Sequence, residues 1–362
     1  MIGHFEPLPR ITRVALIGGL LATVAACSTS AATPTPVSVP AATPAPTLAS
    51  AAPTVATSLA PATPTATTAT ATTAATSPAG LLAGTVLAWG DDGKGQTKVP
   101  AGLSNVVAIS AGDEFAIALK SDGTVVGWGA NDSGQVSVPA GLSGVVAISA
   151  GSSHAIALQS DGTVVGWGNN VDGEIAIPAG LSSVVAISAG GDHNFALKSD
   201  GTVVGWGVDY NGEIDIPAGL HGVVAISAGY LWGLALLKDG TVTGWGDKYP
   251  TDTSVSHAKV PSGLAGVTAI SAGYYHSLVL KSDGTVASWG EGGDGATMIP
   301  AGLSGVTALA AGGNFSLALK SDGSVVGWGS NADGCLTFPA ALKNVIAIDA
   351  GGAFGLALVR NS

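Results

Sequence analysis

From residue 84 onward, apolar residues fall in short runs of four to six that alternate with glycine-rich and polar stretches. In the unit 145–178, residues 145–150 and 156–159 read as two strands. The Asp161-Gly162 pair that follows is typical of a hairpin whose two central residues have positive φ. Residues 163–167 form a third strand. A fourth, 174–177, ends at Pro178, which suits an edge strand. No helical period occurs, so the pattern predicts β-structure throughout.

The same unit returns along the chain, and a Trp-Gly pair marks each copy. The tryptophans are 39 residues apart, except for one interval of 44: Trp89, Trp128, Trp167, Trp206, Trp245, Trp289 and Trp328. Self-similarity at this period indicates units that bury their apolar faces only against one another. Four antiparallel strands per unit, repeated radially, predict an all-β, seven-bladed β-propeller over residues 81–362.

The array holds a whole number of units, but both chain ends fall inside one of them. Residues 345–358 supply two strands of this unit, and residues 85–89 and 97–99 supply the other two. We therefore expect strands from the N- and C-terminal ends to share one blade and close the ring, which would remove an open sheet edge.

The first 80 residues predict that the protein is exported. Arg10 and Arg13 precede an apolar stretch of residues 14–26 that is too short to span a bilayer, which is typical of a signal peptide over residues 1–26. Residues 24–27 resemble a bacterial lipobox, which implies lipidation of Cys27; cleavage of an ordinary signal peptide nearby is the alternative. The Ala/Thr/Pro/Ser-rich remainder of residues 27–80 predicts a disordered stalk. We expect an exported protein, lipid-anchored on the outer side of a bacterial membrane.

Antiparallel topology predicts which loops share a face. Loops after the first and third strands of each unit emerge together and vary between units, whereas the Asp-Gly hairpin and the connection to the next unit are nearly constant. The variable face should therefore carry the binding specificity. It holds Leu231 and all five tyrosines of the chain: Tyr210, Tyr230, Tyr249, Tyr274 and Tyr275. Tyrosine is enriched at protein interfaces, so these residues predict an aromatic arc for a partner. Chance grouping is the alternative.

The variable face is also predicted to be acidic. The residues expected there include Asp113, Glu114, Asp192, Asp209, Asp247, Asp252 and Glu291. Such a field would favour a cationic partner, but Asp also stabilises turns, and both explanations stay open. The net charge of −11 argues against nucleic-acid binding, which needs a basic face.

Catalysis has little support in the sequence. His154, His193 and His276 share a repeat position with aromatic residues and read as packing residues. The serines of each unit recur in register, so none resembles a unique nucleophile. Asp349 breaks the serine column and is expected to line the channel. Cys335 has no partner cysteine in the folded domain, and no complete metal-ligand set is evident. We expect neither cofactor nor enzymatic activity.

The segment GTVVGWGANDSGQVSVPAGLSGVVAISAG, from Gly123, resembles the repeats of the regulator of chromosome condensation superfamily in its short bacterial form, and the secreted beta-lactamase inhibitors within it. This resemblance implies a propeller that binds partners. We expect a monomeric, noncatalytic surface module that recognises a protein or glycan. The alternatives are an inhibitor of a secreted enzyme such as a beta-lactamase, and a hydrolase or lyase. The residues after each Ala-Gly are aromatic in only two units, which departs from the inhibitor pattern.

Overall fold

The computed structural model describes residues 83–247, 256–292 and 294–361, all within the second of two compact units of the chain, residues 65–362. The predicted signal peptide, Cys27 and the stalk lie outside the described residues. The described part of the chain contains 21 strands and no helix. It accordingly offers no helix that could cross a membrane.

Each repeat contributes three consecutive strands to an antiparallel sheet. The first strands are β2 (Val106–Ala111), β5 (Val145–Ala150), β8 (Val184–Ala189), β11 (Val223–Ala228), β14 (Val267–Ala272), β17 (Val306–Ala311) and β20 (Val345–Ala350). The second strands are β3 (Phe115–Lys120), β6 (His154–Gln159), β9 (His193–Lys198), β12 (Trp232–Leu237), β15 (His276–Lys281), β18 (Phe315–Lys320) and β21 (Phe354–Arg360). The third strands are β4 (Val125–Gly129), β7 (Val164–Gly168), β10 (Val203–Gly207), β13 (Val242–Gly246), β16 (Val286–Gly290), β19 (Val325–Gly329) and, from the start of the domain, β1 (Gly84–Gly90).

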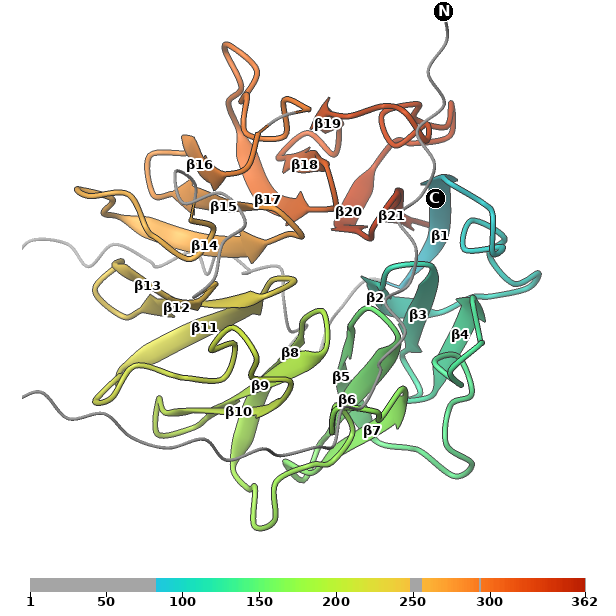
Figure 1. Ribbon diagram of the computed structural model, residues 1–362. Coiled ribbons are helices and arrows are strands. Elements are labelled where there is room, and N and C mark those ends of the chain that lie inside the picture. The colour runs from blue at the N-terminus through green and yellow to red at the C-terminus, as the bar shows by residue number, and fades with distance from the viewer. Residues whose placement is uncertain (1–82, 248–255, 293, 362) are drawn as a thin grey trace, which may run out of the picture. The chain divides into compact units, whose positions relative to one another are not determined.

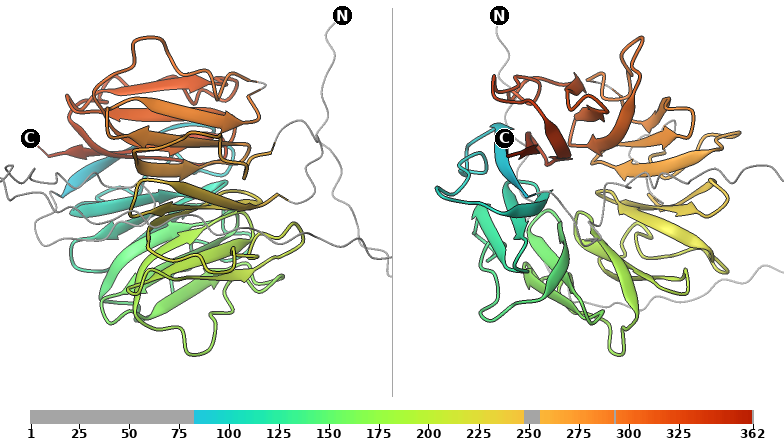
Figure 2. Two further views of the ribbon diagram at one scale, coloured as in Figure 1. Left: turned by 90° about the vertical axis from the view of Figure 1, so that its left-hand side faces the viewer. Right: turned by 180° about the vertical axis from the view of Figure 1, so that it is seen from behind.

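These strands form five three-stranded sheets and one six-stranded sheet, whose order is β20-β21-β1-β2-β3-β4. The first strands lie nearest a common centre and the third strands lie outside them (Figure 1). The same arrangement is seen from behind (Figure 2). A single pair, Gly84↔Val106, joins the two halves of the six-stranded sheet.

Strands from the two ends of the domain pair with each other. β1 runs antiparallel to β21 along its whole length, from Gly84↔Arg360 to Gly90↔Phe354. The pairing of N- and C-terminal strands in one sheet therefore agrees with the sequence prediction.

The predicted fourth strand does not form. Residues 174–177 make local turns instead, in which Ala176 N–H donates to Gly173 O at 3.1 Å and Ile177 N–H donates to Ile175 O at 3.0 Å. The segment packs on the face of the third strand, because a Cβ added at Gly166 would lie 3.0 Å from the Ile175 Cβ. The N–H groups of Ala176 and Ile177 are thus used in local turns and not in a sheet ladder.

The Asp-Gly hairpin also differs from the expectation. Gly162 has a φ of +85°, but Asp161 is not among the residues with positive φ. Gly162 N–H donates to Gln159 O at 3.0 Å, and Gln159 N–H donates to Thr163 O at 2.8 Å. This is a type I turn followed by a left-handed glycine, the usual three-residue hairpin, so only the glycine needs positive φ.

The apolar core lies between neighbouring sheets in seven clusters. One cluster packs Phe115 and Leu119 of β3 against Val145 and Ile148 of β5. Each repeat tryptophan also donates its indole N–H to a backbone carbonyl of the preceding repeat, as Trp167 does to Gln135 O at 2.9 Å. The seven tryptophans thus join repeats to one another.

Candidate functional site

The first strands meet at the centre through a recurring serine. In each case the serine Oγ accepts a hydrogen bond from a backbone N–H of the next repeat, at 2.9–3.1 Å: Ser110 from Ala150, Ser149 from Ala189, Ser188 from Ala228, Ser227 from Ala272 and Ser271 from Ala311. These N–H groups lie on sheet edges that have no further strand to pair with, so the serine supplies the missing acceptor. This role explains why the serines recur in register.

The column is broken at two adjacent repeats, where Ala310 and Asp349 replace serine. Ala310 has no acceptor to offer to Ala350. Asp349 supplies both bonds, because its Oδ2 accepts from Ala111 N–H and its Oδ1 accepts from Ala350 N–H, each at 2.9 Å. The sequence had shown Asp349 without a partner; the structure shows that it compensates for the alanine one repeat earlier.

Glycine follows the column because repeats approach closely there. A Cβ added at Gly112 would lie 2.6 Å from Gly151 O, and one at Gly351 would lie 2.3 Å from Gly112 O. The same glycine also accommodates the ring of the second strand, which is Phe115 beside Gly112.

A pocket lies where these columns meet, with an empty volume of about 550 Å³ that is partly open to solvent. Its wall consists of serine, alanine and glycine from the ends of the first strands, together with Asp349, Tyr230 and Tyr274. No lysine, arginine or histidine is among the described residues that line it. Burial raises the pKa of Asp349 to about 6, although bonds from Ala111, Ala350 and Ser110 oppose the shift. The pocket is therefore polar and anionic at neutral pH.

Three of the predicted tyrosines gather at this pocket. Tyr230 and Tyr274 stack with ring centroids 5.2 Å apart, and Tyr275 meets Tyr274 edge-on at 6.4 Å. Tyr230 and Tyr274 are half-buried, whereas Tyr275 is 40% exposed. Leu231, also half-buried, packs in the same core cluster as Tyr230. The structure thus brings together four of the six aromatic and apolar residues predicted for the site.

The Tyr274 hydroxyl lies close enough to the Asp113 carboxylate to lower the pKa of that carboxyl. Tyr274 follows β14 and Asp113 follows β2, and these strands belong to sheets that share no core cluster. The two side chains therefore approach each other across the centre of the domain. Burial raises the pKa of Asp113, and burial together with the Asp113 charge raises the pKa of Tyr274 well above its usual value.

The other two tyrosines differ. Tyr210 is 65% exposed, and its hydroxyl donates to Asp172 Oδ1 at 3.1 Å. Tyr249 and Asp252 lie outside the described residues. Of the predicted arc, Tyr230, Tyr274 and Tyr275 therefore form one cluster of contacting rings.

Some predicted acidic residues stabilise turns. Asp209 Oδ1 accepts from Ile214 N–H at 3.2 Å, and Asp92 Oδ1 accepts from Thr97 N–H at 3.3 Å. Asp247 differs from the prediction of an exposed acidic residue: it is only 7% exposed, and its Oδ2 accepts from His257 N–H at 2.8 Å. Because Asp247 is bound inside its loop, it contributes little to the surface that a partner would meet.

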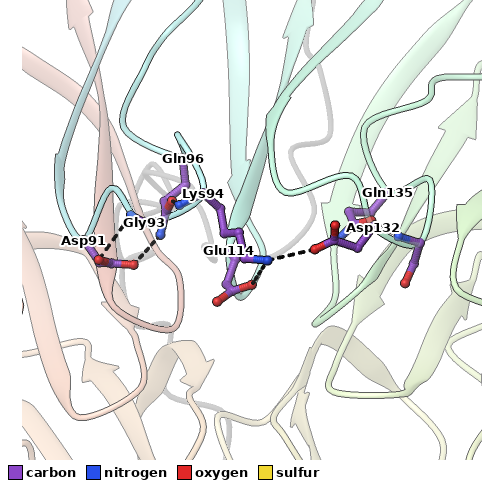
Figure 3. A network of polar contacts seen from close by, with 8 residues as sticks. Asp91, Gly93, Lys94, Gln96, Glu114, Asp132 and Gln135 are labelled. Carbon is purple, nitrogen blue, oxygen red and sulfur yellow. Dashed lines mark hydrogen bonds and ion pairs between the residues drawn. The ribbon is translucent and has the colours of Figure 1, made fainter.

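Other acidic residues on this face are exposed. Glu114 and Glu291 are exposed. Lys94 lies 2.8 Å from Asp132 and 4.0 Å from Glu114 (Figure 3). On the opposite face, by contrast, lysine and aspartate pair across four of the hairpins, as Lys120 and Asp122 do at 2.8 Å. Turn stabilisation therefore explains some of the acidic loop residues, and the others leave acidic side chains exposed on this face.

Sequence reasoning missed a buried polar column beneath these loops, formed by Gln96, Gln135, Glu174 and Glu213. Each side chain accepts a loop backbone N–H, as Glu213 does from Asn211 at 2.7 Å. Burial and the charges of Glu174, Asp172 and Glu213 raise the pKa of Asp192 to about 6. The sequence signal for this buried column is a Gly-Gln or Gly-Glu pair that recurs at the same position in four repeats.

The residues considered for catalysis are structural. His154, His193 and His276 are fully buried, and burial lowers the pKa of His193 to about 3 and that of His276 to about 4. Cys335 is buried, and its thiol donates to Ala353 O at 3.1 Å. Within the described ranges, no group of three His, Cys, Asp or Glu residues could hold a metal ion.

Comparison with known proteins bears on the fold. The family model described as "Regulator of chromosome condensation (RCC1) repeat" matches residues 106–135, 145–174, 184–213, 267–296 and 306–335. A search of curated proteins gave no match.

Solved structures are similar over most of the domain. Prp20p from Saccharomyces cerevisiae, which binds Gsp1p and histones, is 20% identical, with a TM-score of 0.65 over 78% of this chain and 93% of that one. Human WBSCR16 is 19% identical, with a TM-score of 0.61 over 76% and 98% of the two chains. The CRINKLY WD40 ectodomain of the Arabidopsis thaliana receptor kinase ACR4 is 23% identical, with a TM-score of 0.55 over 71% and 91%. Five segments of the chain thus match the RCC1 repeat model, and the similarity to solved structures supports a β-propeller fold.

Proposed function

We propose that this propeller is a noncatalytic module that binds a protein partner through the face carrying the loops after the first and third strands. The observation that carries the proposal is the cluster of Tyr230, Tyr274 and Tyr275 at the mouth of the central pocket, with Tyr275 exposed. Partly buried tyrosines give a rigid contact surface at low entropic cost. The exposed carboxylates around them favour a partner with a basic surface.

A rigid support for this face would come from a closed, seven-bladed ring. Each of the seven core clusters joins two neighbouring three-stranded groups, and following them returns to the starting group. The glycine contacts and the tryptophan bonds follow the same circular order. Closure would hold the loops in place before a partner binds, which reduces the entropy lost on association.

We place the module outside the cytoplasmic membrane, on the stalk of residues 27–80 and anchored through lipidated Cys27, after cleavage of residues 1–26. The propeller itself, residues 81–362, acts as a monomer. Cys27→Ser should move the protein from the membrane fraction to the soluble fraction. Retention in the membrane would contradict the lipid anchor.

Affinity capture from cell-surface extract tests the binding function. The full chain should retain a partner that Tyr230→Ala, Tyr274→Ala and Tyr275→Ala, combined, lose by at least tenfold in affinity. The matched control is Lys120→Ala with Lys198→Ala on the opposite face, which should bind as the unchanged protein does. Equal binding by the tyrosine variant would overturn the proposal.

Inhibition of a secreted enzyme is a narrower form of the same proposal, and the resemblance to beta-lactamase inhibitors names one target class. Titrating the protein into a beta-lactamase assay tests it directly. Inhibition should disappear in the tyrosine variant. An unchanged rate at micromolar protein would remove this target and leave the binding module in place.

A further inference from the structure

The central pocket contains a carboxylate that the ring of serines does not need. Five repeats satisfy the neighbouring N–H with a neutral hydroxyl, which shows that a charge is not required for that bond. At Asp349 one carboxylate accepts from two backbone N–H groups, so a full negative charge replaces the two neutral hydroxyls that the serine pattern would supply, in a pocket wall without a lysine, arginine or histidine. Placing a charge where a hydroxyl serves elsewhere carries a desolvation cost.

The pocket also has aromatic side chains at its rim. Tyr230 and Tyr274 both line it and stack on each other. The Asp113 carboxylate lies near the Tyr274 hydroxyl. A cation entering the pocket would therefore meet tyrosine rings and Asp113 at the rim and Asp349 on the wall. Aromatic faces attract cations, and the attraction is stronger where water is partly excluded.

We propose that this pocket receives one primary ammonium group, the side chain of a lysine on the protein partner, with Asp349 as its acceptor on the wall. The lysine would donate to Asp349, and its aliphatic stem would lie against Tyr230 and Tyr274. The inference rests on the proposed function in one respect, that a protein carries the ammonium group to this face.

The geometry favours ammonium over other cations. A guanidinium binds best to two free, coplanar carboxylate oxygens, whereas both oxygens of Asp349 already accept a backbone N–H. A calcium ion requires six to eight oxygen ligands, commonly including several carboxylates, and no suitable cluster of three acidic or histidine residues occurs in the described part of the chain. An ammonium is a compact charge on a flexible stem, and it suits a wall of serine, alanine and glycine.

The chain itself offers a matched variant that removes the charge and keeps the hydrogen bonds. Ala310→Ser together with Asp349→Ser restores the serine pattern of the other five repeats, so that Ala350 and Ala111 would each regain a neutral acceptor. Ala310→Ser alone adds the hydroxyl and keeps the charge, which makes it the control. Should the double variant fail to fold, Asp349→Asn removes the charge with a nearly equal shape.

The test is a titration of the full chain with n-butylammonium chloride at pH 7.5, followed by the amide resonances of Ala111 and Ala350. Both amides bond to Asp349 and should shift in a saturable way with butylammonium, and not with n-butanol. Ala310→Ser should keep this response. The double variant or Asp349→Asn should lose it by at least tenfold in affinity.

No saturable shift, or an equal shift in the neutral variants, would overturn the ammonium site and leave the loop-face module standing. Capture of a partner whose affinity does not depend on the tyrosines would overturn the proposed function instead. Acetylation of the lysines of a captured partner tests whether the ammonium site and the loop-face module act together. It should weaken the partner's binding to the unchanged protein at least tenfold, and it should weaken binding to the double variant far less. Equal weakening in both would show that the lysine lies elsewhere.

Discussion

The indole N–H of Trp89, in the first strand of the domain, donates to the backbone carbonyl of Cys335 at 2.7 Å across a sequence separation of 246 residues. The other six tryptophans make the same bond to the repeat before them, over 32 residues in each case. Trp89 of β1 is thus bonded to the repeat that precedes β20 and β21, just as each other tryptophan is bonded to the repeat before its own. β1 therefore takes the place of the third strand beside β20 and β21.

Deletion of β1, residues 84–90, should lower the melting temperature far more than deletion of the stalk residues 28–80. The deletion exposes the edge of β21 and removes Trp89 and Val86, which are buried in two core clusters. Thermal unfolding followed by circular dichroism measures both variants. Equal melting temperatures would mean that β1 does not hold the ends together.

Asp349→Ala should destabilise the protein by about 1–3 kcal/mol, since it leaves the N–H groups of Ala111 and Ala350 without their acceptors. Adding Ala310→Ser to this variant should recover part of the loss through Ala350. Urea unfolding of the two single variants and the double variant gives the coupling energy, which should be at least about 0.5 kcal/mol. Strict additivity would show that residues 310 and 349 do not share the Ala350 bond.

Tyr274→Phe should raise the pKa of Asp113. The nearby Tyr274 hydroxyl favours the charged carboxylate and lowers this pKa, while burial raises it, so removal of the hydroxyl leaves burial unopposed. A carboxyl-carbon NMR titration of Asp113 reads the change. Tyr275→Phe is the control and should leave the Asp113 titration in place; a shift in both variants would argue against a specific effect of the Tyr274 hydroxyl.

His193→Phe should make the protein more resistant to acid. The folded-state pKa of His193 is lowered to about 3, whereas an unfolded histidine titrates near 6.5, so the unfolded state binds the extra proton below pH 6.5. Stability that is present above pH 6.5 is therefore lost as the pH falls toward 3. Phe occupies this position in three other repeats, and neither ring nitrogen of His193 has a hydrogen-bond partner.

Relative to the unchanged protein, His193→Phe should gain about 2 kcal/mol between pH 7 and pH 4.5, measured by urea unfolding at both values. His154→Phe is the informative comparison, because it removes the 2.8 Å bond between the ring Nε2 and Asn194 Oδ1 and should cost stability at pH 7. A pH-independent effect of His193→Phe would contradict the buried neutral histidine.

Local pattern was enough to predict much of the fold. The strand order of each repeat, the antiparallel hairpins and the pairing of β1 with β21 follow from apolar runs, turn residues and the repeat count. The fourth strand was wrong because an apolar run bounded by proline looks the same whether it pairs at a sheet edge or packs on a sheet face. Only Gly166, which leaves room for Ile175, separates the two cases.

The sequence predicted which face of the domain carries the site residues, but it did not predict which of them contact one another. Topology predicted that tyrosines and acidic residues share the variable loops, yet it could not say that Tyr274 reaches Asp113 across the centre. Asp247 and Tyr275 looked alike as loop residues, but one is buried against His257 and the other is exposed.

The sequence by itself determined the repeat, the β class and the division into constant and variable loops, because these depend on local periodicity and turn chemistry. Tertiary structure alone decided which residues meet at the centre, where seven distant segments converge. Ala310 and Asp349 are the clearest case: each is one departure from a column in the sequence. Only the close approach of neighbouring first strands shows that the carboxylate supplies the acceptor that the alanine lacks.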